Sequence, residues 1–193
     1  TNLAILIGVS LFLGSALQQV ALKYTDVANA AFFTIFYVPM VPFIIFFMYK
    51  KPVHWSIWPS VFFCVMGGYL LNDFYNETVR LGDTLVLLGA FFWSTHIIFT
   101  GKIIKNYDLP LTIGAIQTLI VSVISLIVGL ILSEDFIWLN ILKEKFQILY
   151  AGILSGGLAF VLQIYAQKNI SPAPSAIIFS LEGVFATIAA WIL

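Results

Sequence analysis

The chain has 193 residues, of which 61% are hydrophobic and 9% charged, and its mean hydropathy is +1.03. A soluble domain of this length cannot bury so much apolar surface, so the composition predicts a protein with several membrane spans. The formal net charge is zero and the basic residues are scattered, which argues against nucleic-acid binding. The single cysteine, Cys64, excludes an intrachain disulfide, and no cluster of metal ligands accompanies it, so we expect neither a metal nor a cofactor.

Charged residues divide the chain into seven apolar stretches, each near the roughly 20 residues that a membrane helix needs. A helix satisfies its backbone hydrogen bonds within one segment, as a segment in lipid must, so we expect an all-α bundle of seven transmembrane helices. Pro39 and Pro42 fall in the second stretch and predict a kink, either a fixed bend or a hinge. In chain order the stretches are residues 3–22, 27–49, 55–72, 84–101, 109–132, 146–167 and 175–193.

A sequence repeat relates the first two stretches to the last two at a constant offset, since 163 − 18 = 145. The second copy begins five spans after the first, and an odd shift inverts it relative to the membrane, an arrangement that is common among transporters. The matched pairs are Ser10 and Ser155, Leu13 and Leu158, Leu17 and Leu162, Gln18 and Gln163, Ala21 and Ala166, Lys23 and Lys168, Ala28 and Ala173, and Ala31 and Ala176.

The repeat predicts a unit of five helices and therefore a parent protein of ten. Residues 1–76 would hold three helices of the first unit, and residues 77–193 would hold four helices of the second. Two further helices would then precede residue 1 and one would follow residue 193. Lys and Arg number five against four on the two sides, and the side with four also carries most of the acidic residues of the loops, so we expect the loops with Lys50, Lys102 and Lys168 in the cytoplasm.

Glu182 and His96 are titratable side chains that lie inside predicted spans. A carboxylate at the bilayer centre costs about 2.5–3.5 kcal/mol on insertion scales, so Glu182 is expected to face the bundle interior. It could couple transport to protons or contact a cation, or it could be a protonated group hydrogen-bonded between helices. His96 shares a helix face with Trp93 and Thr100, and could relay protons with Glu182 or simply bond to a neighbouring helix.

Four further uncharged side chains are predicted to line the cavity. Gln18 and Gln163 are repeat mates, so they should lie at equivalent depths in opposite halves and bind polar groups of a substrate, or else hydrogen-bond between helices. Asn29 and Tyr37 lie at positions i and i+8 of the second stretch, and Tyr37 is the repeat mate of Glu182. The predicted cavity-lining set is Gln18, Asn29, Tyr37, Trp93, His96, Gln163 and Glu182.

Four segments of the chain follow a known family pattern. They are residues 19–34 (QVALKYTDVANAAFFT), 82–102 (GDTLVLLGAFFWSTHIIFTGK), 159–168 (AFVLQIYAQK) and 179–186 (FSLEGVFA), and they resemble the EamA-type domain of the drug/metabolite transporter superfamily. The resemblance implies ten helices in two inverted five-helix repeats, of which this chain would cover helices three to nine. Gly183, where the family usually has proline, and the added Pro39 and Pro42 depart from the pattern and leave the substrate unassigned.

The residues and the resemblance together predict a secondary active transporter rather than an enzyme, since no catalytic motif occurs in any span. We expect it to export small metabolites or drugs across a plasma membrane of the bacterial inner-membrane type by alternating access, with proton coupling through Glu182 or His96. Its partners would be a small-molecule substrate and the lipid bilayer, and its oligomeric state is not predicted. The alternative is a seven-helix membrane receptor, which would need no inverted repeat.

Overall fold

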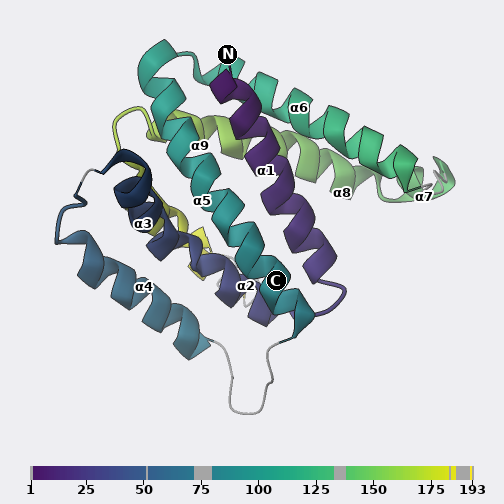
Figure 1. Cartoon of the computed structure of the whole chain (residues 1–193). Coiled ribbons are helices and arrows are strands. Elements are labelled where there is room, and N and C mark those ends of the chain that lie inside the picture. Colours follow the sequence, from purple (N-terminus) through teal and green to yellow (C-terminus); the bar gives the residue numbers. More distant parts are fainter. Residues whose placement is uncertain are drawn as a thin grey trace.

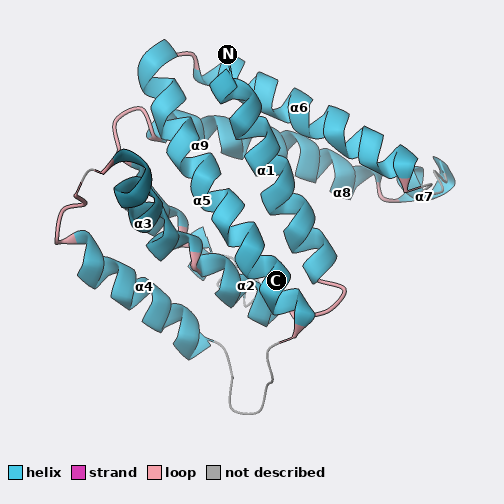
Figure 2. Ribbon diagram, viewed as in Figure 1, coloured by secondary structure: helices cyan, strands magenta, loops and turns pink. Residues whose placement is uncertain are grey.

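The computed structural model describes residues 2–50, 52–71, 80–132, 138–182, 184–185 and 192. Every regular element in these ranges is a helix, which confirms the predicted all-α fold (Figure 2). Five segments of the described chain are long and apolar enough to cross a membrane, namely Asn2–Ala21, Asn29–Tyr49, Leu81–Tyr107, Pro110–Ile131 and Lys145–Ala166. The chain is therefore an all-α, multi-pass membrane protein.

These five segments correspond to the first, second, fourth, fifth and sixth predicted spans. The third predicted span contains a shorter helix, α4 (Ile57–Leu71, 15 residues), and the seventh predicted span begins with α10 (Pro172–Phe179). Much of the seventh span, including Gly183, lies outside the described residues, as does the predicted domain boundary between residues 76 and 77. The prediction of two domains, residues 1–76 and 77–193, therefore stays a prediction.

Helix α5 (Leu81–Tyr107) is the centre of the bundle, and α1 (Asn2–Ala21) runs along it (Figure 1). Small residues bring the two helices together: a Cβ atom placed on Gly89 of α5 would lie 3.3 Å from the carbonyl oxygen of Gly14 in α1. Helices in lipid gain little from hydrophobic association, so such close van der Waals packing is what holds them together. Helix α6 (Pro110–Ile131) packs on the other side of α1.

Three apolar clusters of the described residues include side chains of α5, and the two larger ones flank that helix. One joins α5 to α1, α6 and α9 (Phe160–Ala166), and the other joins it to α3 (Tyr37–Tyr49), α4 and α10. The first contains Ala4, Ile7, Ile103, Ile104, Ile113 and Ile164, and the second contains Tyr37, Val38, Val41, Val61, Ala90, Ile97, Ile98, Ala173 and Ala176. Helix α5 is thus buried between the two groups of helices.

The second span is broken into α2 (Val27–Ile35) and α3, with Phe36 between them. A proline ring clashes with the carbonyl four residues before it, so Pro39 opposes a regular helix through Ile35. Restarting at Tyr37 moves Pro39 into the first turn of α3, where no backbone donor is needed. The kink predicted from Pro39 and Pro42 is therefore a break just before them.

The sixth span changes its helix type along its length. It begins as α8 (Lys145–Leu149), continues as the π-helix η1 (Tyr150–Ala159) and ends as α9. π-Helical turns are rare in proteins, and those that occur are often found at functional sites. Ser155 and Ala159 of this segment line the cavity described below.

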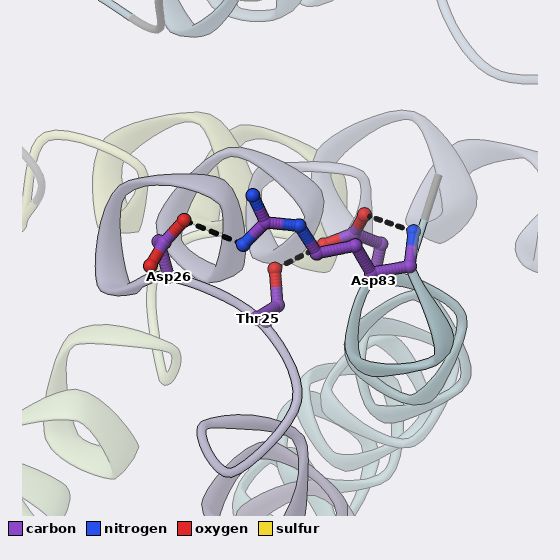
Figure 3. A network of polar contacts seen from close by, with 4 residues as sticks. Thr25, Asp26 and Asp83 are labelled. Carbon is purple, nitrogen blue, oxygen red and sulfur yellow. Dashed lines mark hydrogen bonds and ion pairs between the residues drawn. The ribbon is translucent and has the colours of Figure 1, made fainter. Parts of the chain in front are cut away.

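Polar contacts fix both ends of α5. At its start, the Asp83 side chain is 3% exposed and accepts a hydrogen bond from the Thr25 hydroxyl (Figure 3). It also accepts a hydrogen bond of 2.8 Å from the backbone N–H of Arg80. The Arg80 guanidinium in turn forms an ion pair of 2.6 Å with Asp26. At its end, Asp108 pairs with Lys168 at 2.7 Å, and this hydrogen bond raises the pKa of the Lys168 ammonium. The turns after α1 and α9 are thereby tied to opposite ends of one helix.

Hydrogen bonds between buried side chains also join neighbouring helices. The His96 imidazole, fully buried on α5, donates from Nε2 to Oε1 of Gln117 on α6 at 3.1 Å. Thr95 of α5 lies 3.2 Å from the Ser10 hydroxyl of α1, and Gln167 donates to the Ile97 carbonyl at 3.0 Å. Each such bond between membrane helices is worth about 0.6–2 kcal/mol.

Gly82→Ala should destabilise the protein. A Cβ atom at Gly82 would lie 2.7 Å from both the Ala21 carbonyl oxygen and Cβ of Thr25, so the backbone after α1 must move, at a cost of about 1–3 kcal/mol. Gly67→Ala is the matched control, because no described atom lies within 4 Å of its added Cβ. Thermal unfolding of the full-length protein in detergent should show a lower midpoint for Gly82→Ala only, and equal midpoints would contradict the close approach.

Gln117→Leu should also destabilise, because it leaves a polar atom of the fully buried His96 without its partner, at a cost of about 1–3 kcal/mol. Replacing both partners by apolar groups is far less costly. The double variant His96→Leu, Gln117→Leu should therefore unfold at a higher temperature than Gln117→Leu alone. Strictly additive losses in this double-mutant cycle would mean that the two side chains do not interact.

Candidate functional site

A cavity of about 650 Å³ opens where α1, α2, α3, α5, η1, α9 and α10 come together. Its volume lies within the range of roughly 300–1,000 Å³ that is usual for small-molecule sites. The described residues that line it are Gln18, Thr34, Tyr37, Trp93, Ile97, Ser155, Ala159, Phe160, Leu162, Gln163, Ala166, Ile178, Phe179, Leu181, Glu182 and Phe185.

A chain of hydrogen bonds holds one wall of the cavity. The Trp93 indole on α5 donates to Oε1 of Gln18 on α1 at 3.3 Å, and Gln18 Nε2 donates to the Thr34 hydroxyl on α2 at 3.4 Å. Thr34 in turn donates to the Ala30 carbonyl at 2.7 Å. Gly14 makes room for the indole, since a Cβ atom there would lie 3.2 Å from Nε1 of Trp93. The amide of Gln18 is therefore used by helices of the protein itself.

Aromatic rings pack against one another beside the Gln18 and Trp93 contact. Trp93 and Phe160 lie parallel, with ring centroids 6.2 Å apart, although they come from α5 and α9. His96 meets both rings edge-on, with centroids 6.1 Å and 5.9 Å away. His96 lies outside the cavity lining, packed against these rings and bonded to Gln117.

The helix break at Phe36 puts Tyr37 at the cavity. Its side chain is 4% exposed, and its carbonyl oxygen accepts a hydrogen bond of 3.2 Å from Ser94 of α5. Glu182, the repeat mate of Tyr37, also follows the end of a helix, because α10 stops at Phe179. Non-helical backbone at membrane depth is tolerated where it lines a cavity, and broken helices often surround transporter binding sites.

Five of the predicted site residues come together at this cavity: Gln18, Tyr37, Trp93, Gln163 and Glu182. His96 and Asn29 are buried and do not line it. Among the described contacts, the hydrogen bond of the His96 ring goes to Gln117 rather than to Glu182. The binding roles of all seven residues, and the proton-coupling roles of Glu182 and His96, stay predictions.

The sequence interpretation missed Thr34, Ser155, Phe160 and Phe179, which also line the cavity. A signal for three of them was present: Thr34 lies three residues before Tyr37, Phe160 three before Gln163, and Phe179 three before Glu182. Residues three apart share a helix face. The stacking of Phe160 on Trp93 had no signal in the sequence, because it depends on how α5 and α9 meet.

Three pairs of lining residues share the repeat offset of 145. They are Gln18 and Gln163, Thr34 and Phe179 (179 − 34 = 145), and Tyr37 and Glu182 (182 − 37 = 145). Both members of each pair contribute to one cavity. The lining offers amides, hydroxyls, aromatic faces and one carboxylate, which can bind a ligand but contains no nucleophile paired with a base. No group of three or more His, Cys, Asp or Glu suited to a metal occurs among the described residues.

The chain is similar to a known protein over most of its length. Over 189 residues it is 29% identical to an uncharacterized transporter of Archaeoglobus fulgidus, an alignment that covers 93% of this chain and 57% of the relative. The chain thus spans little more than half the length of that protein. Residues 80–193 match the model of the EamA-like transporter family. Because that match covers more than half of the chain, the protein belongs to the EamA-like transporter family, which confirms the resemblance identified in the sequence.

Proposed function

We propose that the protein is a secondary active transporter that binds a small molecule in the 650 Å³ cavity. Membership of the EamA-like family and the similarity to a transporter support this class of function. The observation that carries the proposal is that three pairs of residues, each 145 positions apart, line one cavity. Two inverted units that meet at a binding site are the arrangement from which transporters build alternating access.

In this proposal, residues 1–76 and 77–193 contribute to opposite units that rock about the cavity. The breaks at Phe36 and after Phe179 lie beside the cavity, where the chain can change direction without losing a long helix. The hydrogen bond from Thr25 to Asp83 joins the two units at the start of α5 and would hold them together there during the motion. We assign export across the plasma membrane as the direction and location, following the family resemblance.

Glu182 is the charged residue of the described cavity lining. A carboxylate in a span is costly, and binding a proton removes that cost when water is excluded. His96 is fully buried outside the lining and bonded to Gln117. We therefore assign proton coupling to Glu182 rather than to His96.

The test is proton movement in liposomes that contain the full-length protein and a trapped pH-sensitive dye. Small molecules are added outside one at a time, and a coupled substrate should change the internal pH at a rate that depends on the protein. Glu182→Gln cannot release a proton, so it should reduce substrate-driven proton movement to the rate of empty liposomes. Direct measurement of substrate flux should accompany the dye signal.

Glu144→Gln is the matched control, since it makes the same chemical change at an exposed residue outside the described cavity lining. It should keep the normal rate, and His96→Gln should keep coupling. Persistent coupling in Glu182→Gln together with its loss in His96→Gln would move the proton site to His96. Ligand binding without any flux would instead favour the receptor alternative.

A further inference from the structure

The two halves of the cavity are not equivalent in how their glutamines are used. Gln18 donates to Thr34 and accepts from Trp93, so both functional ends of its amide are occupied by the protein. Gln163 lines the same cavity at the matching position of the second copy. Within the described part of the chain, the Gln163 side chain makes no hydrogen bond.

The sequence explains this difference. The residue that accepts from Gln18 is Thr34, and its repeat mate is Phe179, whose ring offers no hydrogen-bonding oxygen. The second copy therefore lacks the partner that occupies the amide in the first. A half-buried amide without a protein partner is available to a ligand, and leaving it unpaired is costly if water is excluded.

The second copy also differs from the first by a charged residue. Glu182 lies three residues after Phe179, whereas the first copy has the uncharged Tyr37 at this position. A carboxylate accepts hydrogen bonds and attracts a positive charge, and an amide both donates and accepts. Phe160 and Phe179 line the same cavity and offer aromatic faces to an apolar body or a cation.

We infer that the polar groups of the substrate are bound by Gln163 and Glu182 of the second copy, whereas Gln18 is a positioning residue that holds Trp93. The ligand is then an organic amine that carries an ammonium group, a neutral hydrogen-bonding group and an aromatic or apolar body. This inference rests on the proposed function, because it assigns recognition within the proposed transport cavity.

The probe is L-phenylalaninamide, whose ammonium, carboxamide and ring match these three features. Its binding to the full-length protein in detergent is measured by calorimetry. Gln163→Ala should weaken binding about three- to tenfold, the usual effect of losing one hydrogen bond. Phenethylamine, which lacks the carboxamide, should bind with the same affinity to the wild type and to Gln163→Ala. A loss that is equal for both probes, or no loss, overturns the role of Gln163.

A second pair of variants tests the inference with Gln163 still present. Phe179→Thr supplies the hydroxyl that Thr34 supplies to Gln18, so it should occupy the Gln163 amide and weaken binding of phenylalaninamide. Phe179→Leu is its control, since it removes the ring without adding a hydroxyl. In the Gln163→Ala background the two substitutions at residue 179 should have equal effects. A larger loss for Phe179→Leu than for Phe179→Thr contradicts the inference.

The positioning role of Gln18 has its own readout. If Gln18 acts through Trp93, then Gln18→Ala should change affinity for the probe by less than twofold once Trp93→Phe has removed the indole N–H. Additive effects of these two substitutions would make Gln18 a direct ligand contact. Glu182→Gln should weaken phenylalaninamide binding but leave 3-phenylpropionamide, which has no ammonium group, unaffected.

Binding and flux separate the two hypotheses. Binding that depends on Gln163 and Glu182, without flux in liposomes, overturns the transporter and keeps the binding assignment. Flux of any compound with no binding of phenylalaninamide, or with binding that ignores Gln163, overturns the assignment and keeps the transporter.

Discussion

The close approach of α1 to α5 is the constraint on which the rest of the structure depends. Lipid gives two apolar helices little reason to associate, so they are held where small residues let their backbones meet, at Gly14, Gly82 and Gly89. This contact brings Gln18 within hydrogen-bonding distance of Trp93 and gives the indole its place above Gly14. It also brings Thr25, in the turn after α1, to the buried carboxylate of Asp83.

The second requirement is that polar groups be satisfied inside the bilayer, and it explains where the chain departs from regular helix. The ring of Pro39 opposes a continuous helix, and the resulting break leaves Tyr37 beside α5, where Ser94 donates to its carbonyl oxygen. Nε2 of His96 and Oε1 of Gln117 pair with one another across α5 and α6. The histidine thus contributes to the packing of the bundle while Glu182 lies in the cavity lining.

The cavity combines positional symmetry with chemical asymmetry. Residues 145 positions apart line it together, yet Thr34 corresponds to Phe179 and Tyr37 to Glu182. One bound molecule of low symmetry needs only one set of polar contacts. Under the proposed function, the first copy uses its polar groups to hold the wall, and the second copy presents its polar groups to the ligand.

Several features followed from the sequence alone: the all-α membrane class, most helix positions, the family, and five residues of the cavity lining. They followed because apolar run length, proline chemistry and the repeat are local or strictly periodic along the chain. The tertiary structure alone decided that His96 and Asn29 lie outside the lining, that Phe160 stacks on Trp93 and that Gln18 is already bonded. These facts depend on the rotation of each helix about its axis, and that rotation is set by contacts between segments far apart in the chain.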